Sequence, residues 1–224
     1  MIWTGAAMFF LSLVHFLWRY FFTFGDPAPA SAGVESIAVN CALFSVFAMH
    51  HSALARTGAK AWINRLLGSD RERTLYVWVA SLLFFGVAGL WRPVSGVLWS
   101  LDGWAAWIAW AGQIAGIIFT AWSAGALGVL ELAGVRTAPT SGAAVSLRTD
   151  GPYSVVRHPI YFAWLLLVWS VPHMNGTRLS FAVISTLYLA VAVPFEERSL
   201  VALFGPAYTR YQQQVRARML PFIY

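Results

Sequence analysis

Long apolar runs constrain this sequence more than any other feature. Several approach the roughly 20 residues that an α-helix needs to cross the hydrocarbon core of a bilayer. In lipid the backbone must satisfy its own hydrogen bonds, and runs without a two-residue alternation favour helices over a barrel. The sequence therefore predicts an all-α, polytopic transmembrane helical bundle with about six spans (five to six), over residues 2–24, 34–55, 74–95, 104–132, 159–173 and 179–195.

Composition supports a membrane environment and excludes several classes of function. Of the 224 residues, 59% are hydrophobic and 11% charged, whereas a soluble domain is roughly 25% charged. The basic residues lie between apolar runs and form no single patch, which argues against a nucleic-acid partner and leaves membrane lipids as the expected surroundings. The single cysteine excludes an intramolecular disulfide and a thiolate cluster. His50 and His51 project about 100° apart on a helix, so we predict no metal site.

The basic residues predict how the chain is oriented. Twelve of the fifteen lie in loops on one side of the predicted bundle, and the opposite loops hold only Arg92 and Arg178. The positive-inside rule then places both termini in the cytoplasm, and the inner membrane of a bacterium is the expected location. The twelve are Arg56, Lys60, Arg65, Arg71, Arg73, Arg136, Arg148, Arg157, Arg198, Arg210, Arg216 and Arg218.

Two regions are expected. Residues 1–132 form a four-helix transmembrane region, in which Gly112 and Gly116 predict close packing of one helix against a neighbour. Residues 133–224 form a cytoplasmic loop, a helical hairpin and a tail. Because only residues 172–178 join the last two helices, these must form a hairpin, and residues 157–158 and 196–197 end on the same side of the membrane.

The densest polar cluster lies where this loop enters the hairpin. Pro159 suits the first turn of a helix, where the N–H that proline lacks would be unpaired. His158 and Tyr161 are three residues apart and would share a helix face. Physical chemistry alone favours an ion pair between Arg157 and Glu196 or Glu197, since carboxylates at this depth need a partner.

The spacing of the whole C-terminal string favours a second interpretation. The string resembles the isoprenylcysteine carboxyl methyltransferase and phospholipid methyltransferase superfamily over about 80 residues. An upstream block resembles the branch with the methanethiol S-methyltransferases, although Ser199 and His50 stand where Asp and Gln are expected in many thiol-methylating relatives. The string is Gly151-Pro152-Tyr153, Arg157-His158-Pro159-x-Tyr161, Glu196-Glu197-x-x-Leu200, Phe204-Gly205, Tyr208, Tyr211 and Pro221; the upstream block is His51-Ser52, Ala55-Arg56, Lys60, Trp62, Glu72-Arg73, Tyr76-Val77 and Trp91-Arg92-Pro93.

The resemblance implies a methyltransferase that uses S-adenosylmethionine and a small-molecule or lipophilic acceptor, with a thiol first among the candidates. A thiol reacts best as its thiolate, so a base near the acceptor would help, and His51 is the candidate. An interfacial or capping role for His51 is an equal alternative. The implied cofactor-binding residues are Gly151, Tyr153, Arg157, His158, Pro159, Tyr161, Glu196 and Glu197.

Other functions stay open from the sequence. A prenylcysteine or a phospholipid could be the methyl acceptor. A sterol-type membrane reductase would need basic residues for the 2′-phosphate of NADPH, and Arg136 and Arg148 could supply them. A non-enzymatic accessory protein of denitrification would bind neither cofactor.

Overall fold

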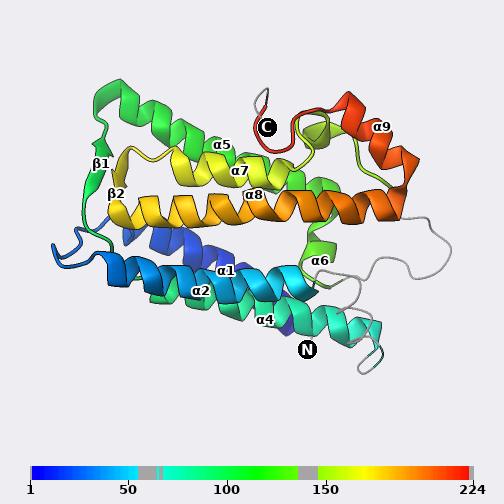
Figure 1. Ribbon diagram of the computed structural model, residues 1–224, viewed down its shortest axis with the longest axis horizontal. Helices are drawn as coiled ribbons and strands as arrows, with labels where there is room; N and C mark the ends of the chain where they lie inside the picture. Colours follow the sequence, from blue (N-terminus) through cyan, green and yellow to red (C-terminus); the bar gives the residue numbers. More distant parts are fainter. Residues whose placement is uncertain (1, 55–64, 66–67, 136–145, 222–224) are drawn as a thin grey trace. The chain divides into compact units, whose positions relative to one another are not determined.

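The computed structural model describes residues 2–54, 65, 68–135 and 146–221 (Figure 1). Most of these residues are helical, and the only described strands are β1 (Val97–Ser100) and β2 (His173–Asn175), which pair antiparallel. The predicted all-α fold is confirmed. The helices are α1 (Ile2–Phe22), α2 (Val34–Leu54), α4 (Ser69–Leu90), α5 (Gly103–Leu127), α6 (Val129–Leu132), the 3₁₀ turn η1 (Gly151–Ser154), α7 (Pro159–Trp169), α8 (Gly176–Phe204) and α9 (Pro206–Gln214).

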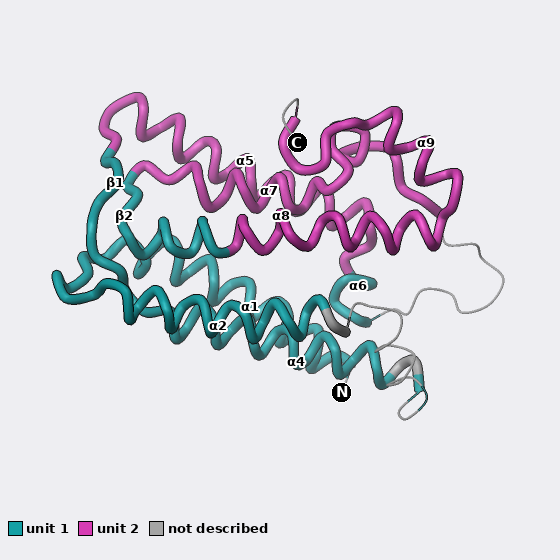
Figure 2. The backbone as a smooth tube through the Cα atoms, viewed as in Figure 1, with its two compact units in different colours: residues 1–100, 130–138, 173–184 teal, residues 101–129, 139–172, 185–224 magenta. Residues whose placement is uncertain are grey.

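The chain divides into two compact units (Figure 2). The first comprises residues 1–100, 130–138 and 173–184, and the second comprises residues 101–129, 139–172 and 185–224. Helix α8 contributes its first turns to the first unit and the rest to the second. Residues 101–129, which the sequence groups with the N-terminal helices, cluster with the C-terminal residues.

Aromatic rings form the core of the first unit. Phe181 of α8 lies 5.1 Å from the ring of Phe16 and 5.0 Å from that of Trp91, centroid to centroid. Helix α4 ends at Leu90, shortly before Pro93. The backbone groups of Arg92, which have no helical partner, are paired by buried Asn40, whose side chain donates to the Arg92 carbonyl and accepts from the Arg92 N–H. Buried polar groups need such partners, so Asn40 fixes how α2 meets the end of α4.

Arg178 has a structural role in the same unit. Its guanidinium is buried and donates to the carbonyls of Tyr20 and Phe21, and to that of His173. The last carbonyls of a helix have no partner within the helix, and a cation there also complements the helix dipole. Arg178 thus caps the C-terminus of α1.

Close packing of α5 against α7 organises the second unit. A Cβ at Gly116 would lie 2.8 Å from the carbonyl oxygen of Ala163 and from the amide nitrogen of Leu167, and a Cβ at Gly112 would meet Ser170. Side-chain volume is therefore excluded on this face of α5, as the spacing of the two glycines predicts. Gln113 lies between them and donates to the carbonyl of Leu167.

Within the described residues, four helices are long and apolar enough to cross a membrane: α1, α4 from Arg71, α5 and α8. Helix α7 is apolar but has only 11 residues, and α2 is not among the four. These helices make the chain an integral membrane protein. Arg56, Lys60 and Arg136, on which part of the predicted orientation rests, lie outside the described residues.

Helix α8 corrects one prediction. The sequence places the end of this helix at residue 195, but it continues to Phe204. Pro194 removes one backbone hydrogen bond without ending the helix, and the residues after it are mostly good helix formers. Glu196 and Glu197 therefore lie on a helix and project about 100° apart.

Candidate active site at the C-terminal end of α8

A buried ion pair joins the start of α7 to α8. Nε of Arg157 lies 2.6 Å from Oε1 of Glu197, and both side chains are at most 6% exposed. Nη1 of Arg157 also donates to the carbonyls of Val215 and Arg216 in the tail. The predicted convergence of residues 157–158 with residues 196–197 is confirmed, and Glu197 is the pairing partner of Arg157.

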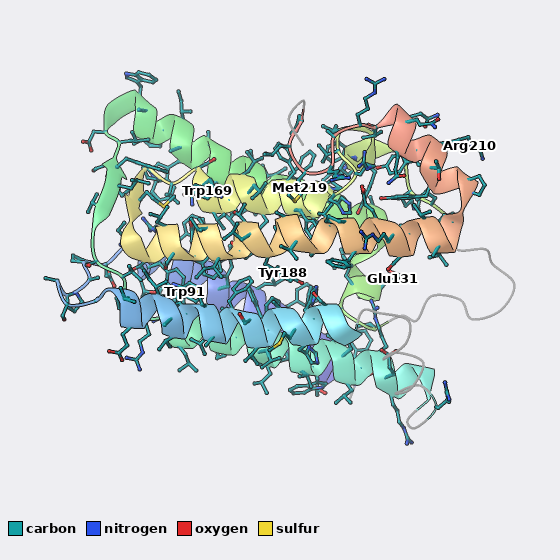
Figure 3. All side chains as sticks on the ribbon, in the orientation of Figure 1. Trp91, Glu131, Trp169, Tyr188, Arg210 and Met219 are labelled. Atoms are coloured by element: carbon teal, nitrogen blue, oxygen red, sulfur yellow. The ribbon has the colours of Figure 1, made fainter. Side chains whose placement is uncertain are left out.

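The tail after α9 is fastened to the same place. The amides of Arg157 and His158 donate to the carbonyls of Ala217 and Arg218 at 3.0 and 2.9 Å. These amides precede the first turn of α7, where helix amides have no partner of their own. Met219 (Figure 3) is buried one residue further on, where it packs with Leu165, Leu189 and Val193.

His158 lies between the two glutamates. Its Nδ1 is 3.6 Å from Oε2 of Glu196, and its Nε2 is 3.4 Å from Oε1 of Glu197. Nε2 is buried without a hydrogen-bond partner. The ring of Tyr161 stacks parallel to the imidazole, with centroids 5.4 Å apart, and its hydroxyl donates to Glu196 at 2.8 Å. The prediction that His158 and Tyr161 share a face is confirmed.

The two glutamates differ in environment. The side chain of Glu196 is 43% exposed, whereas that of Glu197 is 6% exposed. Oε2 of Glu197 accepts from Gln212 and lies 3.3 Å from Nε of Arg218. Glu197 therefore ties α7, α8, α9 and the tail together, while Glu196 has an accessible carboxylate.

Gly151 and Tyr153 shape the turn before α7. Gly151 has φ +58°, a conformation that favours glycine, at the start of η1. The ring of Tyr153 is buried against Tyr208 and Tyr211, and the Tyr211 hydroxyl donates to the Tyr153 carbonyl at 2.6 Å. Burial raises the pKa of the Tyr211 hydroxyl, which keeps it a donor. Pro159 is the first residue of α7, as predicted.

A hollow of about 350 Å³ lies beside Glu197, within the size range of ligand sites. Four of its residues form one stripe of α8, and the other two come from α9 and the tail. From the sequence, Arg198 and Arg218 counted only as loop charges, and no pattern predicted that they would line a hollow. The lining residues are Pro194, Glu197, Arg198, Val201, Gln212 and Arg218.

The candidate base His51 belongs to the first unit. Its Nδ1 lies 3.0 Å from the hydroxyl of Tyr76, and its ring stacks on Phe47 with centroids 5.4 Å apart. The ring of His50 stacks on the ring of Tyr76, with centroids 5.8 Å apart. His51 is thus held by packing and by one hydroxyl.

Comparisons with known proteins agree with the resemblance. Residues 104–207 match the family described as phospholipid methyltransferase. Methanethiol S-methyltransferase 2 of Bradyrhizobium diazoefficiens is 35% identical over 84% of this chain and 74% of its own length. Methanethiol S-methyltransferase of Mycobacterium tuberculosis is 31% identical over 97% and 94%. Nurim of Rattus norvegicus is 28% identical over 84% and 74%. No solved structure matches the chain significantly.

Proposed function

Because this chain belongs to the family of membrane methyltransferases that includes the methanethiol S-methyltransferases, we propose that it transfers a methyl group from S-adenosylmethionine to a small thiol. Its similarity to proteins so named, over most of both chains, is the observation that carries the proposal. S-Adenosylmethionine supplies a methyl group on a positively charged sulfur. Attack by a thiol gives a thioether and S-adenosylhomocysteine, and the thiol proton is released.

The cluster around Glu197 suits this cofactor. The methionyl end of S-adenosylmethionine carries an ammonium group and a carboxylate, and the hollow beside Glu197 offers a carboxylate and two guanidinium groups. The buried Nε2 of His158 lies 3.4 Å from Oε1 of the same glutamate, so the imidazole adds a polar group to this cluster. In this proposal Glu197 accepts from the ammonium group or a ribose hydroxyl. Arg157 acts by holding Glu197 in place.

The remaining sequence-predicted residues position this cluster. Tyr161 and His158 orient the accessible carboxylate of Glu196. Pro159 starts α7, and Gly151 and Tyr153 set the turn that leads to it. Methyl transfer needs the two reactants aligned and water excluded, so rigid positioning is the main contribution that such residues make.

His51 remains the proposed base for the acceptor thiol. Its hydrogen-bonding partner Tyr76 orients the ring, as a base requires. We further propose that both termini face the cytoplasm of a bacterial inner membrane, from the distribution of basic residues. Phospholipid is the second candidate acceptor, because residues 104–207 match the family of that name.

One experiment tests the proposal. The purified protein in detergent is incubated with S-adenosylmethionine labelled in its methyl group, and with methanethiol, a prenylcysteine or phosphatidylethanolamine. We expect labelled dimethyl sulfide from methanethiol, and a loss of product in the Glu197→Gln and His51→Ala variants. Transfer of the label to phosphatidylethanolamine alone would identify the lipid, and not the thiol, as the methyl acceptor. The absence of label from every acceptor, together with no binding of S-adenosylhomocysteine, would refute the proposed function.

A further inference from the structure

We propose that His50 binds the sulfur atom of the methyl acceptor, and that this acceptor is a small thiol. The inference rests on the proposed function and deepens it, because it adds a substrate-binding residue beside the base His51. It follows from the hydrogen bonds that His50 lacks, from the rings that position its imidazole and from the chemistry of sulfur.

The ring nitrogens of His50 need a partner. Among the histidines that the structure describes, His50 alone has both Nδ1 and Nε2 buried without a hydrogen-bond partner. A neutral imidazole carries one N–H donor and one acceptor, and a buried polar group left unsatisfied costs about 1–3 kcal/mol. A group of this kind calls for an explanation such as a bound ligand or a catalytic role.

Tyr76 of α4 positions the imidazoles of both histidines. The ring of His50 lies nearly parallel to the ring of Tyr76, with an angle of 15° between the planes. The hydroxyl of the same tyrosine lies 3.0 Å from Nδ1 of His51. The two imidazoles are therefore arranged around one side chain, and a side chain that is already positioned loses less entropy when a ligand binds.

Stacking alone does not require an imidazole at position 50. A phenyl ring would make the same contact with Tyr76, and it would have no polar atoms to remove from water. The two nitrogens of His50 are thus the feature that the packing leaves unexplained. A ligand with a polar group would explain them.

A small thiol suits the chemistry of this cluster. Sulfur packs favourably against aromatic rings, and the cluster presents Tyr76 together with Phe47, whose ring stacks on His51 with centroids 5.4 Å apart. When His51 takes the proton of the thiol, the N–H of His50 donates to the thiolate and stabilises its charge. The thiolate then forms a bond to the methyl carbon, and the electron pair of the broken bond stays on the cofactor's sulfur.

The amine of phosphatidylethanolamine suits the same nitrogens less well. It has several N–H groups that need acceptors, whereas the neutral imidazole of His50 offers only one. The observations therefore favour the thiol over the lipid as the group bound here.

Two substitutions separate the nitrogens of His50 from its ring. His50→Phe keeps a ring to stack on Tyr76 and removes both nitrogens, while His50→Gln keeps one donor and one acceptor. The matched control is His15→Phe, because His15 belongs to the same unit and its ring also stacks on a ring of α4, that of Phe85, with centroids 4.0 Å apart. The detergent-purified full chain is used throughout.

The measurements are KM and kcat for methanethiol at saturating S-adenosylmethionine, and the Kd of S-adenosylhomocysteine. We expect His50→Phe to raise KM about tenfold or more, the size expected when a hydrogen bond to a charged group is lost. The Kd should stay within about twofold, which also reports that the variant is folded. His50→Gln should recover most of the loss in KM, and His15→Phe should behave as the unaltered protein does.

An unchanged KM in His50→Phe overturns the inference, because a buried water would satisfy the nitrogens without making KM depend on them. So does an equal loss in His50→Gln and His50→Phe, or a loss in His15→Phe of the same size.

A second measurement needs no substitution that could impair folding. The ¹⁵N resonances of the His50 imidazole, assigned by their absence in His50→Gln, should shift when methanethiol is added to the protein with bound S-adenosylhomocysteine. Resonances that do not shift overturn the inference. If the unaltered protein methylates no thiol, the proposed function itself fails, whereas thiol methylation that is indifferent to His50 removes only the role of this residue.

Discussion

Nε of Arg157, which precedes α7, lies 2.6 Å from Oε1 of Glu197 on α8, and both side chains are almost fully buried. Removal of one partner from such a pair leaves a buried charge without compensation, which costs more than the intact pair contributes. The pair is thus a point at which both stability and the site's geometry can be tested.

Glu197→Gln is expected to destabilise the protein by about 3 kcal/mol, the lower end for a broken buried pair, because the amide oxygen can still accept a hydrogen bond. The matched control is Glu196→Gln, since the neighbouring side chain is 43% exposed. It should cost less than about 1 kcal/mol. Thermal unfolding in one detergent measures both. Equal unfolding temperatures for the two variants would contradict the central role given to Glu197.

Gly116→Ala is expected to destabilise the packing of α5 on α7. The new Cβ would lie 2.8 Å from backbone atoms of Ala163 and Leu167, which cannot move aside as a flexible side chain can. Overpacking of this kind costs about 1–3 kcal/mol.

Gly125→Ala provides the control on the same helix, because a Cβ there meets nothing within 4 Å. Alanine favours helix over glycine by up to about 1 kcal/mol, so this variant should be neutral or stabilised. Chemical or thermal unfolding of the two variants in parallel gives the difference. A Gly116→Ala protein as stable as Gly125→Ala would show that the two helices do not pack as closely as described.

The fold could be predicted from the sequence because apolar runs and helix periodicity are local signals. The meeting of residues 157–158 with residues 196–197 was also predictable, since a short connection forces a hairpin. The pairing of Arg157 with Glu197 was not, because two adjacent glutamates differ only in helix phase, and the sequence placed the end of α8 before them. The position of Arg218 beside Glu197 depends on where the tail returns, which no local pattern specifies.

Tyr211→Phe should destabilise the second unit by about 1–2 kcal/mol, because it removes the donor to the buried carbonyl of Tyr153. Burial raises the pKa of Tyr211 above its ordinary value, which is about 10. Because the pKa of this hydroxyl is higher in the folded protein than in the unfolded chain, its stabilising effect is complete at any pH below the pKa of the unfolded chain. The effect is lost as the pH rises through the pKa of the folded protein.

Unfolding free energies of the two proteins across pH therefore test the role of the hydroxyl. The difference between the unaltered protein and Tyr211→Phe should be constant up to about pH 9 and should decrease at higher pH. Because Tyr153 and Tyr208 also titrate late, only this difference isolates Tyr211. A difference that grows as the pH rises above 10 would have the opposite sign and would refute the assignment.

Met219→Ala should release the tail. Met219 is 3% exposed and packs with Leu165, Leu189 and Val193, and loss of a buried methionine side chain costs about 2–5 kcal/mol. The tail contains two sites for trypsin, after Arg216 and Arg218, whose carbonyls accept hydrogen bonds from Arg157 and His158 in the folded protein. Cleavage at these sites follows the population of the released tail, so it should be at least about tenfold faster in the variant.

Leu203→Ala is the control, because that side chain is 64% exposed and its truncation should leave the rate unchanged. Mass spectrometry of timed digests measures both rates, and equal rates for Met219→Ala and the unaltered protein would mean that Met219 does not anchor the tail.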